Sequence, residues 1–230
     1  MSLEVLYEDN HLIAVSKKAG DIVQGDKTED EPLVDKVKAY IKKKYNKPGD
    51  VYLGIIQRLD RPVGGVVVFA RTSKALTRMN KLFQERKVQK TYWAVVEQLP
   101  KSNEEVLIHY LKKNQEKNRS RSYDKEVKGS KRSELYYRLA GRSKNYFYVE
   151  VKPKTGRHHQ IRVQLSHIGC PIKGDVKYGA NRTNRDGSIH LLARSLEFVH
   201  PVSKEEMKIS AMPPKKDPLW TEFYELEKNK

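Results

Sequence analysis

QRLDRPVGGVVVFA, residues 57–70, is the stretch that decides how this chain folds. Its first half places one carboxylate, Asp60, at a bend marked by two glycines, and its second half is an apolar run rich in β-branched residues. Such a run predicts a buried strand, so we expect the bend at the edge of a sheet, where a rigid element holds Asp60. Arg58 and Arg61 flank the carboxylate, which favours its ionised form and suits a nucleophile. An ordinary salt-bridged turn would have the same pattern.

The chain's composition indicates a polyanionic partner. Its 230 residues include 46 Lys and Arg against 29 Asp and Glu, a net charge of +17, and nucleic acid is the leading candidate for such a partner. An anionic membrane also fits the charge, but no apolar stretch approaches the roughly 18 residues that a spanning helix needs. The acidic N-terminus lacks the features of a signal peptide, so we expect a cytoplasmic protein without a membrane anchor. The length predicts a single domain over residues 1–230, or two lobes that share one sheet, and a monomer.

Cysteine and histidine usage argues against a metal site. The one cysteine, Cys170, excludes an intramolecular disulfide and a multi-cysteine zinc site. None of the seven histidines forms a pair at the i, i+3 or i, i+4 spacing of a helical metal site. Because His158 and His159 are adjacent, we expect their side chains to diverge. The sequence therefore predicts no metal.

Strand and helix patterns are interleaved along the chain. Alternating or continuous apolar runs predict strands at 11–16, 66–70, 89–96, 135–139 and 147–151, with a hairpin turn at 141–145. Helical spacing predicts helices at 33–45, from a cap at Ser73 to Phe83, at 160–168 and near 220–227. Hairpins outnumber strand-helix-strand units, which favours an α+β fold on a mixed, largely antiparallel sheet with peripheral helices.

The segment from Lys112 to Arg132 is strongly basic. It holds nine Lys and Arg, three acidic residues and hardly any apolar ones. This composition predicts a mobile loop or a β-hairpin arm. The arm could bind phosphates and add affinity, or it could be a solvated basic loop.

Five blocks of the sequence resemble the RluA-type RNA pseudouridine synthases. Residues 57–70 resemble the family signature, Arg-Leu-Asp-Arg followed by a glycine-containing bend and an apolar strand that ends in Ala. Four more blocks follow in family order: KTYWAVV at 90–96, TGRHHQIRV at 155–163, SHIGCPIKGD at 166–175 and LLARSLEFVHP at 191–201. Several ordered blocks are far more specific than one short pattern. The resemblance covers about residues 7–212 and implies a curved central sheet with an active-site cleft across its middle, without room for a preceding S4 RNA-binding domain.

The resemblance also assigns roles to residues. Asp60 matches the catalytic carboxylate, Tyr92 the tyrosine that lies against the extruded uracil, and Arg162 the basic residue that pairs with the carboxylate. Leu191 matches an aliphatic residue on the other side of the base, and Arg58 an arginine that enters the helical stack in place of the base. The remaining substrate contacts are expected from Lys90, Arg157, His159 and Gln160, of which Arg157 and His159 stand at a helix start that favours phosphate.

The implied reaction converts uridine to pseudouridine in structured ribosomal or transfer RNA. The N1–C1′ bond breaks, the base rotates, and C5 bonds to C1′ instead, which requires no metal, nucleotide or redox cofactor. It does require a nucleophile or charge stabiliser beside the sugar and a way to take the uridine out of its stack.

Two departures from the family pattern are present. Gln57 replaces a common His, and Val63-Gly64-Gly65 replaces Thr-Ser-Gly, so we expect altered substrate contacts and retained chemistry, with an easier bend at Gly64.

The sequence has two alternative interpretations besides a pseudouridine synthase. A catalytically inactive, synthase-like RNA-binding or ribosome-assembly factor would share the charge but would not need Asp60, Tyr92 and Arg162 together. A nucleotide-dependent enzyme is excluded, because Asp175 stands where the glycine-rich phosphate loop of residues 169–175 would need Lys.

Overall fold

The computed structural model describes residues 3–26 and 28–229. The described residues form two compact units, each built from more than one segment of the chain. The first unit takes its residues from Met1–Gln89 and Ala193–Met212, and the second from Lys90–Leu192 and Pro213–Lys230. Two lobes were one of the two expected arrangements.

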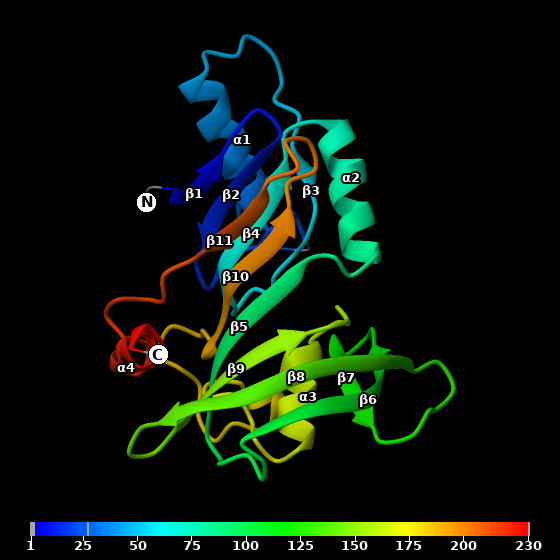
Figure 1. Ribbon diagram of the computed structural model, residues 1–230, viewed down its shortest axis with the longest axis vertical. Helices are drawn as coiled ribbons and strands as arrows, with labels where there is room; N and C mark the ends of the chain where they lie inside the picture. Colours follow the sequence, from blue (N-terminus) through cyan, green and yellow to red (C-terminus); the bar gives the residue numbers. More distant parts are fainter. Residues whose placement is uncertain (1–2, 27, 230) are drawn as a thin grey trace. The chain divides into compact units, whose positions relative to one another are not determined.

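The first unit is an antiparallel sheet with two helices (Figure 1). Its strands follow the order β1 (Val5–Glu8), β2 (Leu12–Lys17), β4 (Gly64–Ala70) and β10 (Leu191–Val199), with β3 (Gly54–Ile55) beside β4 and β11 (Glu206–Ser210) beside β10. Its helices are α1 (Leu33–Lys44) and α2 (Ser73–Gln84).

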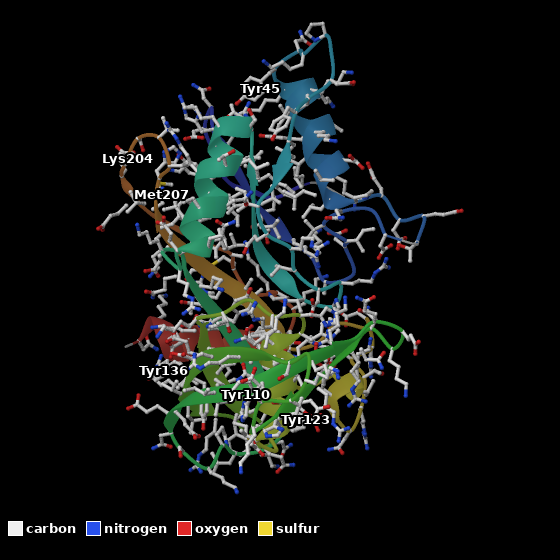
Figure 2. All side chains as sticks on the ribbon, turned by 90° about the vertical axis from the view of Figure 1, so that its right-hand side faces the viewer. Tyr45, Tyr110, Tyr123, Tyr136, Lys204 and Met207 are labelled. Carbon is white, nitrogen blue, oxygen red and sulfur yellow. The ribbon has the colours of Figure 1, made fainter. Side chains whose placement is uncertain are left out.

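The core of the first unit follows from strand alternation. Leu12, Val66 and Val68 are fully buried and pack with Met79 of α2. Residues of the same strands that point to the opposite face are buried too. Figure 2 shows why, since α2 lies on one side of these strands and α1 on the other. Both faces of β2 and β4 are therefore covered, which explains their continuous apolar runs.

The helices begin and end close to their predicted bounds. The α2 cap is one residue earlier than expected, because Thr72, not Ser73, accepts a hydrogen bond from the Ala75 amide at 3.1 Å. In α1 three lysines of the last turn lie near the carbonyl end of the helix dipole.

The second unit also contains antiparallel strands. Its strands follow the order β5 (Gln89–Val96), β9 (Phe147–Pro153), β8 (Lys131–Arg142), β6 (Glu104–Asn114) and β7 (Arg119–Tyr123). The helical elements are α3 (Gln160–His167), the short 3-10 helix η1 (Val176–Tyr178) and α4 (Pro218–Lys228). Helix α3 lies against β6 and β7, and α4 inserts Phe223 against Trp93, with ring centroids 4.5 Å apart.

The basic segment 112–132 is ordered as part of a β-hairpin. Lys112 pairs with Arg121 across β6 and β7, and Asn114 pairs with Arg119 next to the turn. The other edge of β6 pairs with β8. The predicted hairpin is present in β6 and β7, whereas residues 124–130 of the segment belong to neither strand.

The predicted α+β class with a largely antiparallel sheet is confirmed. The pairs β2–β4, β6–β7 and β6–β8 are all antiparallel. Across residues 3–26 and 28–229, none of the helices is both long and apolar enough to cross a membrane.

Candidate active site

The Asp60 loop of the first unit is built over a buried lysine. Lys17 ends β2, has 2% of its surface exposed, and points its ammonium at the backbone of the loop. Its Nζ lies 3.2 Å from the carbonyl oxygen of Asp60, 3.0 Å from that of Arg61 and 2.7 Å from that of Val63. A rigid strand therefore fixes the peptide from the candidate nucleophile onward.

The surroundings of Lys17 lower its pKa to about 8. Burial is the main cause, while the charges of Asp21 and Asp60 oppose it. The ammonium thus carries a positive charge close to the Asp60 carboxylate at neutral pH. A lysine at this place was not anticipated from the sequence, where it reads as the polar end of a strand.

The two arginines beside Asp60 have partners elsewhere on the first unit. Arg61 donates to Asp30 at 2.7 Å and to Thr28 at 2.6 Å, and Arg58 donates to Gln24 at 3.3 Å. Arg58 is exposed. An exposed guanidinium held by a neutral acceptor can be released at low cost.

A glycine after the loop allows β4 to approach β10 closely. Gly65 has φ +118°, and a Cβ built there would lie 2.2 Å from the carbonyl oxygen of Ala193. The position that requires glycine is thus Gly65, whereas Gly64 has no positive φ. The departure at Val63 and Gly64 leaves this requirement intact. Gln57 keeps a structural bond, since its Nε2 donates to the Val66 carbonyl at 3.2 Å.

The second unit holds the other expected site residues on β5, at the start of β10 and around α3. Tyr92 is half-buried and pairs with Val151 of β9. Leu191 is buried at the first position of β10. Lys90 donates to the Thr155 carbonyl at 3.3 Å, and burial lowers its pKa to about 8.

Arg162 is held by a carboxylate that was not expected to have a role. Its Nε lies 2.6 Å from Oδ2 of Asp175 and its Nη2 2.8 Å from Oδ1. Both residues are at least 95% buried, and the guanidinium also lies 5.1 Å from the ring centroid of Tyr178. This two-point ion pair fixes the plane of the guanidinium. A signal existed in the sequence, an acid directly after Gly174 in an otherwise apolar stretch.

The histidine pair at the start of α3 differs from the expectation. The rings of His158 and His159 stack with centroids 3.7 Å apart, so the prediction that they diverge is wrong. The cause is local, since His159 adopts a left-handed conformation, φ 55°, at the N-cap of α3. His159 Nδ1 then lies 2.8 Å from the Tyr178 hydroxyl, and His158 Nδ1 lies 2.9 Å from Ser120 Oγ.

Gln160 builds the turn before α3. Only 4% of its surface is exposed. Its Oε1 accepts from Thr155 Oγ1 at 2.7 Å and from the Arg157 amide at 3.0 Å, while its Nε2 donates to the Glu134 carbonyl at 3.0 Å. Arg157 itself is exposed beside this turn. The structure thus brings Arg162, Asp175, Tyr178 and His159 together.

Comparison with known proteins identifies the family. The model of the RNA pseudouridylate synthase family matches residues 11–167. The chain belongs to this family. The match includes the Asp60 loop, Tyr92 and Arg162.

Two curated relatives show how far the similarity extends. The tRNA pseudouridine synthase C of Haemophilus influenzae is 33% identical, over 91% of this chain and 92% of the relative. The ribosomal large subunit pseudouridine synthase C of Buchnera aphidicola subsp. Schizaphis graminum is 34% identical, over 90% of this chain and 66% of the relative. The chain therefore spans just under two thirds of the length of that ribosomal relative.

Solved structures of the family share the fold. Human RNA pseudouridylate synthase domain containing 4 aligns with a TM-score of 0.79 at 22% identity, over 98% of this chain and 93% of that one. Human RNA pseudouridylate synthase domain containing 1 aligns with a TM-score of 0.68, also at 22% identity, over 96% and 87%. The predicted pseudouridine synthase fold and the family of RNA pseudouridine synthases are confirmed.

Proposed function

We propose that this member of the family isomerises uridine to pseudouridine in structured RNA, with Asp60 as the residue that acts on the sugar or base. The observation that carries the proposal is the Asp60 loop. A family signature occupies it, and the buried Lys17 ammonium, bound to three carbonyls of the loop, holds its backbone in place. A protein that only binds RNA would have no need for a carboxylate so positioned in a chain of net charge +17.

The remaining residues are proposed to position the flipped uridine. The ring of Tyr92 would stack on the uracil, with its hydroxyl near the C5 proton that must leave. Leu191 would pack on the other side of the base. Arg162, oriented by Asp175, would pair with the catalytic carboxylate or the target phosphate. Arg58 would replace the extruded base in the stack.

Further contacts with RNA are proposed to come from Lys90, Arg157 and His159, the first two as phosphate partners. Gln160 is proposed to support the RNA contact of Arg157 indirectly, because its side-chain amide is hydrogen-bonded within the turn that carries Arg157. The proposed substrates are ribosomal or transfer RNA, the two classes named for the relatives. We propose that the enzyme acts as a monomer in the cytoplasm, without metal or cofactor in the reaction.

The proposal is tested by Asp60→Asn. The amide nearly keeps the shape of the carboxylate but is neither nucleophilic nor charged, so pseudouridine formation should stop while RNA affinity stays or rises slightly. Release of tritium from RNA labelled at uridine C5 measures turnover, with circular dichroism for folding and filter binding for affinity. The matched control is Asp50→Asn, at an exposed position outside the site. Turnover of the Asp60 variant at the normal rate would refute the catalytic role and favour an RNA-binding factor.

The substrate is found by mapping pseudouridine in total RNA with and without the gene. One missing site in ribosomal or transfer RNA would name the target.

A further inference from the structure

Three side chains of the second unit converge at a point that the proposed reaction does not use. His109 comes from β6, Asp124 follows the end of β7, and His167 is the last residue of α3. His167 Nε2 lies 2.7 Å from Asp124 Oδ1, and His109 Nε2 lies 3.9 Å from the same oxygen. One ligand atom from each residue lies within 4.8 Å of the other two.

The spacing approaches that of a tetrahedral metal site. Donor atoms about 2.0–2.1 Å from a tetrahedral ion lie about 3.3 Å apart. The 2.7 Å edge between His167 and Asp124 must therefore widen, and the 3.9 Å edge between His109 and Asp124 must shorten, by about 0.6 Å each. Asp124 and His167 can supply that movement, because 79% and 28% of their side chains are exposed, whereas His109 is held in the interior with 7% of its surface exposed.

The fold fixes the two imidazoles from different directions. β6 lies between β7 and β8 in the sheet, and His109 pairs with Ser133 of β8, one residue before the ladder to β7 begins at Tyr110. The rings of His109 and His167 meet edge to face with centroids 4.5 Å apart. The arrangement thus presents two nitrogens and one carboxylate oxygen, which leaves a fourth position for water.

The positive charges of the basic residues in the β6–β7 hairpin repel a cation, so binding of a metal ion depends on the negative charge of Asp124.

Gln164 of α3 provides an outer support. It is fully buried, and its Nε2 lies 3.0 Å from His109 Nδ1 and 3.3 Å from the Leu107 carbonyl. Its Oε1 is buried and has no hydrogen-bond partner among the described residues. A half-turn of the amide would bring this oxygen to His109 Nδ1, where it accepts a hydrogen bond from Nδ1–H in the tautomer that leaves Nε2 able to bind a metal. The half-turn gives up the bond to Leu107.

We propose that His109, Asp124 and His167 bind one divalent transition-metal ion, with Zn²⁺ as the ion that the ligand set fits best. Two imidazoles and a carboxylate with an open position are a common zinc ligand set. The ion would tie the basic hairpin to the C-terminal end of the helix that carries Arg162. The sequence argument against a metal concerned histidine pairs within one helix, and ligands from three separate elements lie outside that argument.

The test is metal binding by the whole protein, independent of its activity on RNA. Isothermal titration with Zn²⁺, and the visible absorption of added Co²⁺, should show one saturable site per chain. Asp124→Asn and His167→Ala should each weaken the affinity at least about tenfold. Both residues lie at the surface of the unit, so folding is expected to persist and is checked by circular dichroism.

Asp50→Asn is the matched control, since it removes an exposed carboxylate elsewhere and should bind Zn²⁺ like the parent. Zn²⁺ should also raise the midpoint of thermal unfolding of the parent in a concentration-dependent way, and should do so less in the two site variants. The proposal is overturned if no 1:1 binding is seen, or if Asp124→Asn and His167→Ala bind Zn²⁺ as tightly as the parent.

Discussion

Lys17 shows how one buried side chain can hold the backbone around Asp60, the proposed catalytic residue. Its ammonium is desolvated, which is costly, and the cost is offset by carbonyl oxygens from the Asp60 loop. The ammonium stabilises the Asp60 loop only when the carbonyl oxygens of the loop point toward it. The stability of the loop and the placement of Asp60 are therefore linked.

Lys17→Met tests this link and should lower both the free energy of unfolding and the turnover rate. Loss of the ammonium leaves the loop carbonyls without their donor, so we expect a free energy of unfolding lower by about 1–3 kcal/mol at pH 7 and a turnover rate at least about tenfold lower. RNA affinity should be nearly unchanged. Urea denaturation, single-turnover tritium release and filter binding measure the three quantities. Lys42→Met, at an exposed position of α1, should match the parent in all of them, and normal turnover of Lys17→Met would argue against a positioning role.

Asp175 has the same kind of role in the second unit. Asp175→Asn keeps the shape of the side chain but removes the negative charge that holds the buried Arg162 guanidinium at two points, so we expect a loss of about 3–5 kcal/mol in the free energy of unfolding. Turnover should fall with it, while the exposed control Asp50→Asn stays normal. Chemical denaturation checks the stability, and an Asp175→Asn protein as stable as the parent would mean that the ion pair contributes little.

At the scale of elements, the sequence predicted the buried parts of the fold better than the edges. The β4 strand and the α2 face were visible because apolar residues repeat with the period of a strand or a helix. By contrast, β7 and the end of β6 are formed by polar and basic residues, and the periodicity of apolar residues does not report their pairing.

The sequence likewise pointed to only some residues of the candidate site. The Asp60 loop was found because its motif is local, and the resemblance brought in Tyr92 and Arg162. Lys17 and Asp175 were missed because their roles come from contacts made only after folding, 43 residues away for the pair Lys17 and Asp60. The stacking of His158 on His159 was missed because we expected the side chains of adjacent residues to diverge. The left-handed backbone of His159 changes the direction of its side chain.

The β6–β7 hairpin is the element expected to add RNA affinity. Replacing Lys112, Lys113 and Arg121 by Gln removes three exposed charges. For each phosphate that these side chains neutralise in the parent, the slope of log affinity against log salt should become shallower by about 0.7–0.9. Turnover of saturated complex should stay nearly constant. Filter binding over a salt series measures the slope.

The matched variant removes three exposed lysines of the first unit, Lys42, Lys43 and Lys47. An equal change of slope in both variants would point to general charge attraction, and no change in the hairpin variant would show that the hairpin does not bind RNA.

For the whole molecule, buried ionisable groups predict an alkaline optimum of stability. The folded pKa values of Lys17 and Lys90 are about 8, below the ordinary value, so between about pH 8 and pH 10.5 the unfolded chain binds more protons and stability rises with pH. Tyr7 and Tyr137 act in the opposite sense, because their pKa values are raised to about 12. Above about pH 10 the unfolded tyrosines lose protons first, and stability falls.

The free energy of unfolding should therefore have a maximum between about pH 8 and pH 10, and in Lys90→Met the rise on the acid side should be smaller. Urea titrations at a series of pH values, followed by circular dichroism, measure it. A steady fall in stability from about pH 7.5 upward would contradict the expectation.

The distribution of optical probes over the two units has a practical result. Both tryptophans, Trp93 and Trp220, and the single thiol, Cys170, belong to the second unit, and the thiol is buried with its pKa raised to about 11. Tryptophan fluorescence and thiol labelling therefore report on the second unit. A native fluorescence signal in a variant of Asp60 or Lys17 is no proof that the Asp60 loop is intact. A tryptophan introduced at Phe69, a buried position of β4, would give the first unit a signal of its own.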